Sequence, residues 1–125
     1  MWTKLILIAV VGAVGTLCRY WVSGLTYQVM GSEFAYGTLA VNVFGCLLFG
    51  VVWTLSDERM AISALARTVI LVGFMGAFTT FSTFAFETMN YVKDGQLTLA
   101  FMNMTTNCVL GFGAIVIGNW IARAL

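Results

Sequence analysis

Long apolar runs dominate the chain, and only short polar segments separate them. Four intervals lack Asp, Glu and Lys and contain a single Arg between them: residues 5–32, 34–56, 68–86 and 95–122. About 20 apolar helical residues cross the hydrocarbon core of a bilayer, so each interval predicts one transmembrane helix. The apolar runs are continuous and do not alternate, which argues against a β-barrel. The pattern predicts one all-α membrane domain over residues 1–125, with helices at about 3–30, 35–56, 61–92 and 96–123.

The ends of these helices carry most of the charge. The first run begins like a secretory signal, but apolar residues resume beyond Arg19, so we interpret it as an uncleaved first helix. Four spans place both termini on one side, where Lys and Arg outnumber the single Lys93 of the other side, and this favours cytoplasmic termini. Four helices are too few to enclose a wide aqueous path, so we expect an oligomer.

Composition excludes several classes of protein. Of the 125 residues 61% are hydrophobic and 9% charged, which is unlike a soluble globular domain. The net charge of +1 without a basic cluster argues against a nucleic-acid partner. The chain has no His, and its three Cys are scattered, so no zinc site is predicted. An enzyme is also disfavoured, because no embedded acid pair or activated nucleophile is visible.

Polar residues within the apolar runs are the first candidates for function, because unpaired polar groups are costly in lipid. Arg19 either faces an aqueous vestibule or extends to the membrane surface. Asn42 either donates hydrogen bonds to a permeating ion or links helices. Asn103 and Asn107 are four residues apart on the fourth helix and form a second polar stripe. Glu87 lies either just inside the membrane or at its surface.

The third run has the most unusual composition. Residues 73–87 combine two Gly, four hydroxyl residues and several Phe, and the chain contains no Pro. Gly, Ser and Thr weaken the helical hydrogen-bond ladder, so we predict a third helix broken near its centre. Exposed main-chain groups at that depth are tolerated where they line a cavity or bind an ion. Phe78, Phe81 and Phe84 either pack a helix face or present electropositive ring edges to an anion.

Three motifs together resemble the Fluc (CrcB) family of bacterial fluoride channels. They are Gly12-x-x-Gly15-x-x-x-Arg19-Tyr20, Gly37-Thr38-Leu39-x-x-Asn42-x-x-Gly45, and Gly73-Phe74-x-Gly76-x-Phe78-Thr79-Thr80-Phe81-Ser82-Thr83-Phe84-x-x-Glu87. The resemblance covers the whole chain, and the third motif is highly specific. It implies a passive, fluoride-selective channel that exports F⁻ across the bacterial inner membrane and protects against fluoride toxicity. It also implies an antiparallel, dual-topology homodimer with two pores.

The resemblance assigns roles to particular residues. Phe81 and Phe84 would contact fluoride through their ring edges, Asn42 would donate to it, and Arg19 would lie at the aqueous entrance. Main-chain carbonyls of two residues would hold one structural Na⁺ at the dimer centre with their symmetry mates, namely Gly76 and Thr79. Further polar residues would surround the pore: Thr80, Ser82, Thr83, Glu87, Asn103 and Asn107. The two asparagines differ from the aromatic and hydroxyl residues expected on the fourth helix. At these two positions the resemblance therefore implies only that the side chains are polar.

Two other functions fit a small four-helix membrane protein. A small multidrug-resistance-type transporter has similar length and dual topology, but its mechanism needs a carboxylate embedded in the membrane, preferably in the first helix. The first helix here carries Arg19 and no acid. A purely structural membrane subunit explains the composition but does not explain the broken third helix.

Overall fold

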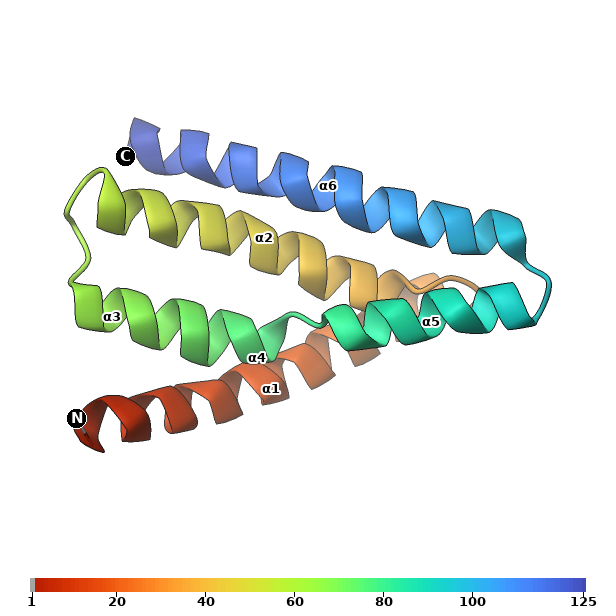
Figure 1. The fold of residues 1–125 in the computed structure, drawn as a ribbon, viewed down its shortest axis with the longest axis horizontal. Coiled ribbons are helices and arrows are strands. Elements are labelled where there is room, and N and C mark those ends of the chain that lie inside the picture. The colour runs from red at the N-terminus through yellow and green to blue at the C-terminus, as the bar shows by residue number, and fades with distance from the viewer. Residues whose placement is uncertain (1) are drawn as a thin grey trace.

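The computed structural model describes residues 2–125, and within this range every regular element is a helix (Figure 1). Four helical units are long and apolar enough to cross a membrane: α1 (Trp2–Met30), α2 (Tyr36–Asp57), the composite third unit Ala64–Lys93, and α6 (Leu97–Ala124). The prediction of an all-α protein with four spanning helices is therefore confirmed.

The third unit consists of four consecutive pieces: α3 (Ala64–Thr68), the π-helix η1 (Val69–Met75), α4 (Gly76–Phe78) and α5 (Phe81–Lys93). Between α4 and α5 the backbone becomes extended, with ψ of 162° at Thr79 and 110° at Thr80. The predicted break in the third helix is confirmed, and it lies at two hydroxyl residues. Gly76 itself has helical dihedral angles, so the glycines do not make the break.

The π-helical turns of η1 were not predicted. A π-helix widens the helix by one residue per turn, and such segments often occur at functional sites. The apolar sequence of η1 gives no local signal for it, whereas α1 approaches η1 very closely. A Cβ on Gly73 would lie 3.1 Å from the carbonyl oxygen of Ile8, so η1 and α1 meet almost backbone to backbone.

The helices pair through small residues. α2 packs most extensively against α6, and α1 packs against η1, α4 and α2 (Figure 1). A Cβ on Gly118 of α6 would collide with the carbonyl oxygen of Leu47, and one on Gly50 of α2 would collide with that of Ile115. Glycines on both helices therefore let their backbones approach, which is the usual way that helices associate in membranes.

Charged side chains connect the helices at one end of the bundle, where the α2–α3 loop lies beside the C-terminus of α6 (Figure 1). Arg123 donates two 2.7 Å hydrogen bonds to the Glu58 carboxylate, and Arg59 donates to the main-chain oxygen of Arg123 at 2.9 Å. Arg67 pairs with Asp57 at 3.3 Å. These contacts fasten the ends of α2, α3 and α6 to one another.

Candidate functional site

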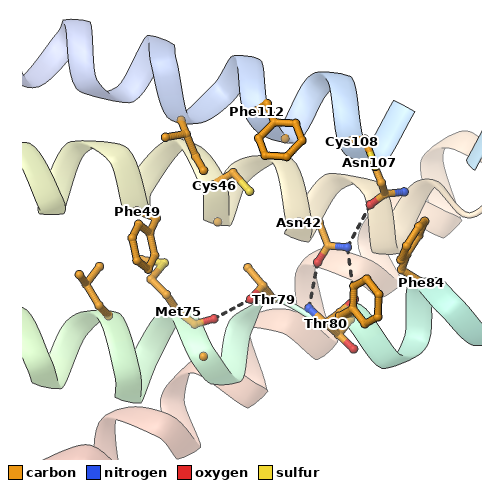
Figure 2. A pocket seen from close by; sticks show the side chains of 16 residues that line it. Asn42, Cys46, Phe49, Met75, Thr79, Thr80, Phe84, Asn107, Cys108 and Phe112 are labelled. Carbon is orange, nitrogen blue, oxygen red and sulfur yellow. Dashed lines mark hydrogen bonds between the residues drawn. The ribbon is translucent and has the colours of Figure 1, made fainter. Parts of the chain in front are cut away.

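A groove of about 410 Å³ opens between α2, the broken third unit and α6 (Figure 2). Its walls are mainly apolar, and polar side chains gather where the third unit is interrupted. The lining residues are Asn42, Gly45, Cys46, Phe49, Leu71, Met75, Gly76, Thr79, Thr80, Phe81, Phe84, Asn107, Cys108, Gly111, Phe112 and Ile115. Seven of the residues selected from the sequence thus line a single surface.

Asn42 connects α2 to the interruption. Its Oδ1 accepts a hydrogen bond from the Thr80 N–H at 2.8 Å, and its Nδ2 donates to the Thr80 carbonyl at 3.2 Å (Figure 2). Nδ2 also donates to Oδ1 of Asn107 at 3.0 Å. Both amide hydrogens of Asn42 are therefore engaged within the chain, and a direct bond to an ion requires one of them to open.

The polar stripe of α6 continues this network away from the groove. Asn107 donates to the main-chain and side-chain oxygens of Asn103, each at 3.0 Å. Asn103 is fully buried and donates to the Thr88 hydroxyl, which donates to the carbonyl of Phe84 at 2.8 Å. The two asparagines thus join α6 to α2 and α5, and only Asn107 reaches the groove.

Thr80 begins α5 as its N-cap residue. Its hydroxyl accepts a hydrogen bond from the Thr83 N–H at 3.2 Å, which satisfies one of the amides left free at a helix start. The same hydroxyl donates to Oγ1 of Thr83 at 2.9 Å and lies 3.3 Å from Oγ of Ser82. The three hydroxyl residues therefore form one cluster, of which only Thr80 lines the groove.

The interruption separates the three periodic phenylalanines. Phe78 is 2% exposed and stacks on Phe74 with ring centroids 5.5 Å apart, so it is a packing residue. Phe81 is 78% exposed and Phe84 is half-buried, and both line the groove. Their rings lie 5.5 Å apart at 57°, a tilted arrangement in which the two rings are not stacked face to face.

The main-chain carbonyls where α4 ends lose their usual helical donors, and those of Gly76 and Thr79 are the two selected from the sequence. In an uninterrupted helix the Gly76 carbonyl would accept from the Thr80 N–H, and the Thr79 carbonyl from the Thr83 N–H. Here Asn42 binds the first of these amides and the Thr80 hydroxyl binds the second. Carbonyl oxygens at the negative end of a helix suit a hard cation, so these residues fit a Na⁺ ion.

The sequence matches the family model described as CrcB-like protein, Camphor Resistance (CrcB), over residues 6–119. The chain belongs to the CrcB family. It is 48% identical over its full length to a protein of Solidesulfovibrio magneticus and 45% identical to one of Nitrosococcus oceani, which is also covered completely. A Geobacter relative is 48% identical, with 98% of each chain covered. All three relatives are named fluoride-specific ion channel FluC.

Glu87, which closes the third motif of this CrcB chain, lies outside the groove. Its Oε1 accepts hydrogen bonds from the Tyr27 hydroxyl at 2.9 Å and from the Thr38 hydroxyl at 2.8 Å. Its Oε2 is buried without a hydrogen-bond partner among the residues that the structure describes. It lines a separate pocket of about 300 Å³ with Tyr27, Ser32, Phe34, Ala35, Asn90 and Tyr91.

Arg19 lies on α1, half-buried, and does not line the groove. The structure of this CrcB protein therefore leaves it apart from the other candidates. Three residues with clear hydrogen-bond partners were not selected from the sequence as site residues: Tyr27, Thr38 and Thr88. The spacing of Thr38 one turn before Asn42 was a usable signal. Tyr27 meets Glu87 across 60 positions, and Thr88 meets Asn103 of the next helix, so neither contact can be seen in a single segment.

Proposed function

We propose that this chain is a fluoride channel of the bacterial inner membrane and not an enzyme. Membership of the CrcB family, with relatives of the same length that are named fluoride-specific ion channels, carries the proposal. The four spanning helices are consistent with a multi-pass membrane protein. Passive export of F⁻ would protect the cell against fluoride toxicity.

The pore we propose runs along the groove beside the interruption. Fluoride is small and strongly hydrated, so a selective pore must replace its water with donors and electropositive ring edges. Phe81 and Phe84 expose rings to the groove and would supply those edges. Asn42 and Thr80 would provide polar groups beside them, with Asn107 behind Asn42. A narrow bore would exclude the larger chloride ion.

The remaining polar residues would lie along the approach to this pore. Ser82 and Thr83 extend the hydroxyl cluster of Thr80, and Asn103 supports Asn107 from behind. Arg19 would raise the local anion concentration at an aqueous entrance. Glu87 would belong to the polar surroundings further along α5.

The functional unit would be an antiparallel, dual-topology homodimer with two pores. The groove is open on one chain, and its apolar walls suit a second copy of the chain as the opposite wall. The carbonyls of Gly76 and Thr79 from both chains would form an oxygen cage for one structural Na⁺. When bound, this ion would neutralise the converging carbonyl dipoles and join the two chains.

The requirement for Na⁺ is tested by replacing it with a large organic cation during purification. We expect the dimer to weaken, because the converging carbonyls lose their ligand, while the ion selectivity of the remaining dimer is unchanged. The fraction of dimer is read by light scattering during size-exclusion chromatography. A dimer fraction that does not respond to the replacement would count against the cation site.

Fluoride efflux from liposomes tests the proposed function directly. Purified protein is reconstituted under a K⁺ gradient, valinomycin is added, and fluoride release is followed with an electrode, with chloride release measured in parallel. We expect rapid fluoride release and negligible chloride release. Failure of folded protein to release fluoride contradicts the proposal, and uptake of cationic dyes would then test the multidrug-transporter alternative. No observation favours that alternative, since α1 contains no acidic residue.

A further inference from the structure

The side-chain amide of Asn42 binds Thr80 in the way that one strand binds another. It accepts from the Thr80 N–H at 2.8 Å and donates to the Thr80 carbonyl at 3.2 Å (Figure 2). An antiparallel hydrogen-bonded pair exchanges the same two bonds between residues of neighbouring strands. Asn42 therefore gives the extended backbone at Thr80 the hydrogen-bond partners that a continuous helix would otherwise supply.

The remaining hydrogen of the amide fixes its orientation. Nδ2 donates to Oδ1 of Asn107, and Asn107 is itself held by two bonds to Asn103. A flipped Asn42 would turn its NH₂ toward the Thr80 N–H and its oxygen toward two acceptors, so only the observed orientation satisfies every group. The neighbouring helix thus holds the Asn42 acceptor against Thr80.

The backbone of α2 comes close enough for this short side chain to reach the interruption. A Cβ on Gly45, one turn beyond Asn42, would collide with the side chain of Thr79. The absence of a side chain at Gly45 therefore permits the approach. Once Asn42 binds the Thr80 N–H, that amide is unavailable to the Gly76 carbonyl.

We propose that Asn42 is a positioning residue that keeps the third span broken at Thr79 and Thr80, and so keeps the Gly76 carbonyl free. The inference rests on the proposed function, in which that carbonyl binds the central cation. A backbone N–H without a partner is costly at membrane depth. Removal of the Asn42 acceptor therefore drives the Thr80 N–H back to Gly76 and extends α4 through the interruption.

This role differs from that of a direct ion ligand. Loss of a ligand lowers ion flux but leaves the backbone of the third span unchanged. Loss of a positioning residue changes the backbone conformation of the interruption whether or not fluoride is present. The decisive measurement is therefore the conformation of the Thr79–Thr80 peptide.

The sequence offers a selective label for this peptide, because a Thr followed by a Thr occurs only at Thr79–Thr80 and at Thr105–Thr106. Labelling Thr with carbon-13 at the carbonyl and nitrogen-15 at the amide gives two correlated resonances in a solid-state NMR spectrum of protein in bilayers. The carbonyl-carbon shift of Thr79 distinguishes helical from non-helical backbone, and the resonance of Thr105, which lies within α6, is the helical reference. We expect a non-helical Thr79 resonance in the unmodified protein, where ψ is 162°, and a shift to the helical range in Asn42→Leu.

Three further variants complete the test. Asn42→Ser also removes the amide without adding bulk, and it should show the same helical shift. Asn42→Asp retains an oxygen that accepts from the Thr80 N–H in either protonation state, so its resonance should stay at the unmodified position. Asn119→Leu is the matched control, since it removes another amide contact between α2 and α6, the 3.1 Å bond from Thr54, without touching the interruption.

A resonance at the unmodified position in folded Asn42→Leu or Asn42→Ser overturns the proposal, as does a helical shift in Asn42→Asp. Fluoride efflux from the same preparations separates this inference from the proposed function. Unmodified protein without fluoride efflux contradicts the function but leaves the resonance test valid. If the unmodified protein releases fluoride and the resonance of Asn42→Leu does not shift, only the positioning role is contradicted.

Discussion

At the scale of single residues, each polar group within a span acts through its particular partner. Asn42 and Asn107 have the same side chain, but one binds backbone at the interruption and the other orients the first. Phe78 and Phe81 are three residues apart, yet the first is buried and the second is exposed to the groove. Residue type therefore identified candidates, and position relative to the interruption distinguishes their roles.

Replacement of the groove phenylalanines tests the proposed ring-edge contacts. Phe81→Ile and Phe84→Ile retain apolar volume but remove the ring quadrupole, a contact worth about 1 kcal/mol, so we expect fluoride efflux to fall about fivefold each. Phe101→Ile replaces an exposed phenylalanine of α6 outside the groove and should leave efflux unchanged. Unchanged efflux from both groove variants would refute the contact, provided that each variant is folded.

The Glu58–Arg123 pair predicts a small dependence of stability on pH. Hydrogen bonds from Arg123 lower the pKa of the Glu58 carboxyl below its ordinary value. The stabilisation is therefore fully present above about pH 4.3 and is lost as the pH falls through the lowered pKa. The effect is small because the pair is exposed and screened by salt.

Thermal unfolding of the protein and of Glu58→Gln, measured between pH 7 and pH 3, isolates this contribution. The difference in melting temperature between the two proteins should shrink as the pH falls, because the unmodified carboxyl becomes protonated. A difference that stays constant to pH 3 would exclude the pair as its source.

At the scale of helices, close approach of backbones determines which groups can meet. Glycines allow α2 to approach α6 and the interruption, and Asn42 reaches Thr80 only through such an approach. The interruption itself divides one span into two short helices whose ends lie within the bundle. Packing between helices and the break in the third span therefore depend on each other.

Gly118→Ala tests the contact between α2 and α6. Its Cβ would collide with the carbonyl oxygen of Leu47 and lie 3.0 Å from the Val51 nitrogen, so the helices must separate. We expect a loss of stability of about 1–3 kcal/mol in denaturant unfolding followed by circular dichroism. Gly113→Ala, with no heavy atom within 4 Å of the added Cβ, is the matched control. Equal stability of the two variants would contradict the close contact.

At the scale of the whole molecule, the bundle exposes apolar side chains on every spanning helix. α1 contains one buried residue, Gly15, and the groove beside the interruption is open on one side. Lipid covers exposed apolar side chains at no cost, whereas polar groups at the groove need water or a second chain. This contrast supports the proposed dimer across the groove.

Cysteine labelling of a terminus tests the proposed dual topology. A single accessible Cys is placed at the C-terminus of a cysteine-free variant, and intact cells are treated with a membrane-impermeant maleimide before and after permeabilisation. Dual insertion predicts that about half of the termini react from each side. Labelling from one side only would exclude the antiparallel dimer, and it would fit the excess of Lys and Arg at the end that carries both termini.

The sequence by itself determined the all-α class and the four spans, because each depends on local composition, and it predicted that the third helix is weak near its centre. Bilayer thickness sets the length of an apolar run, and clustered Gly, Ser and Thr weaken a helix wherever they occur. The family motif likewise selected the candidate residues. None of these signals indicated the π-helix, whose apolar residues resemble those of any other span.

Only the tertiary structure decided which polar groups are partners. Asn42 lies 38 positions from Thr80 and 65 positions from Asn107, and it binds both. Glu87 binds Tyr27, which lies 60 positions away. Such pairings depend on how closely the helices pack and how they are rotated about their axes, and no single segment contains that information. The sequence could therefore identify the polar residues of the membrane interior, while helix packing determined that Asn42 replaces the missing helical partner of Thr80.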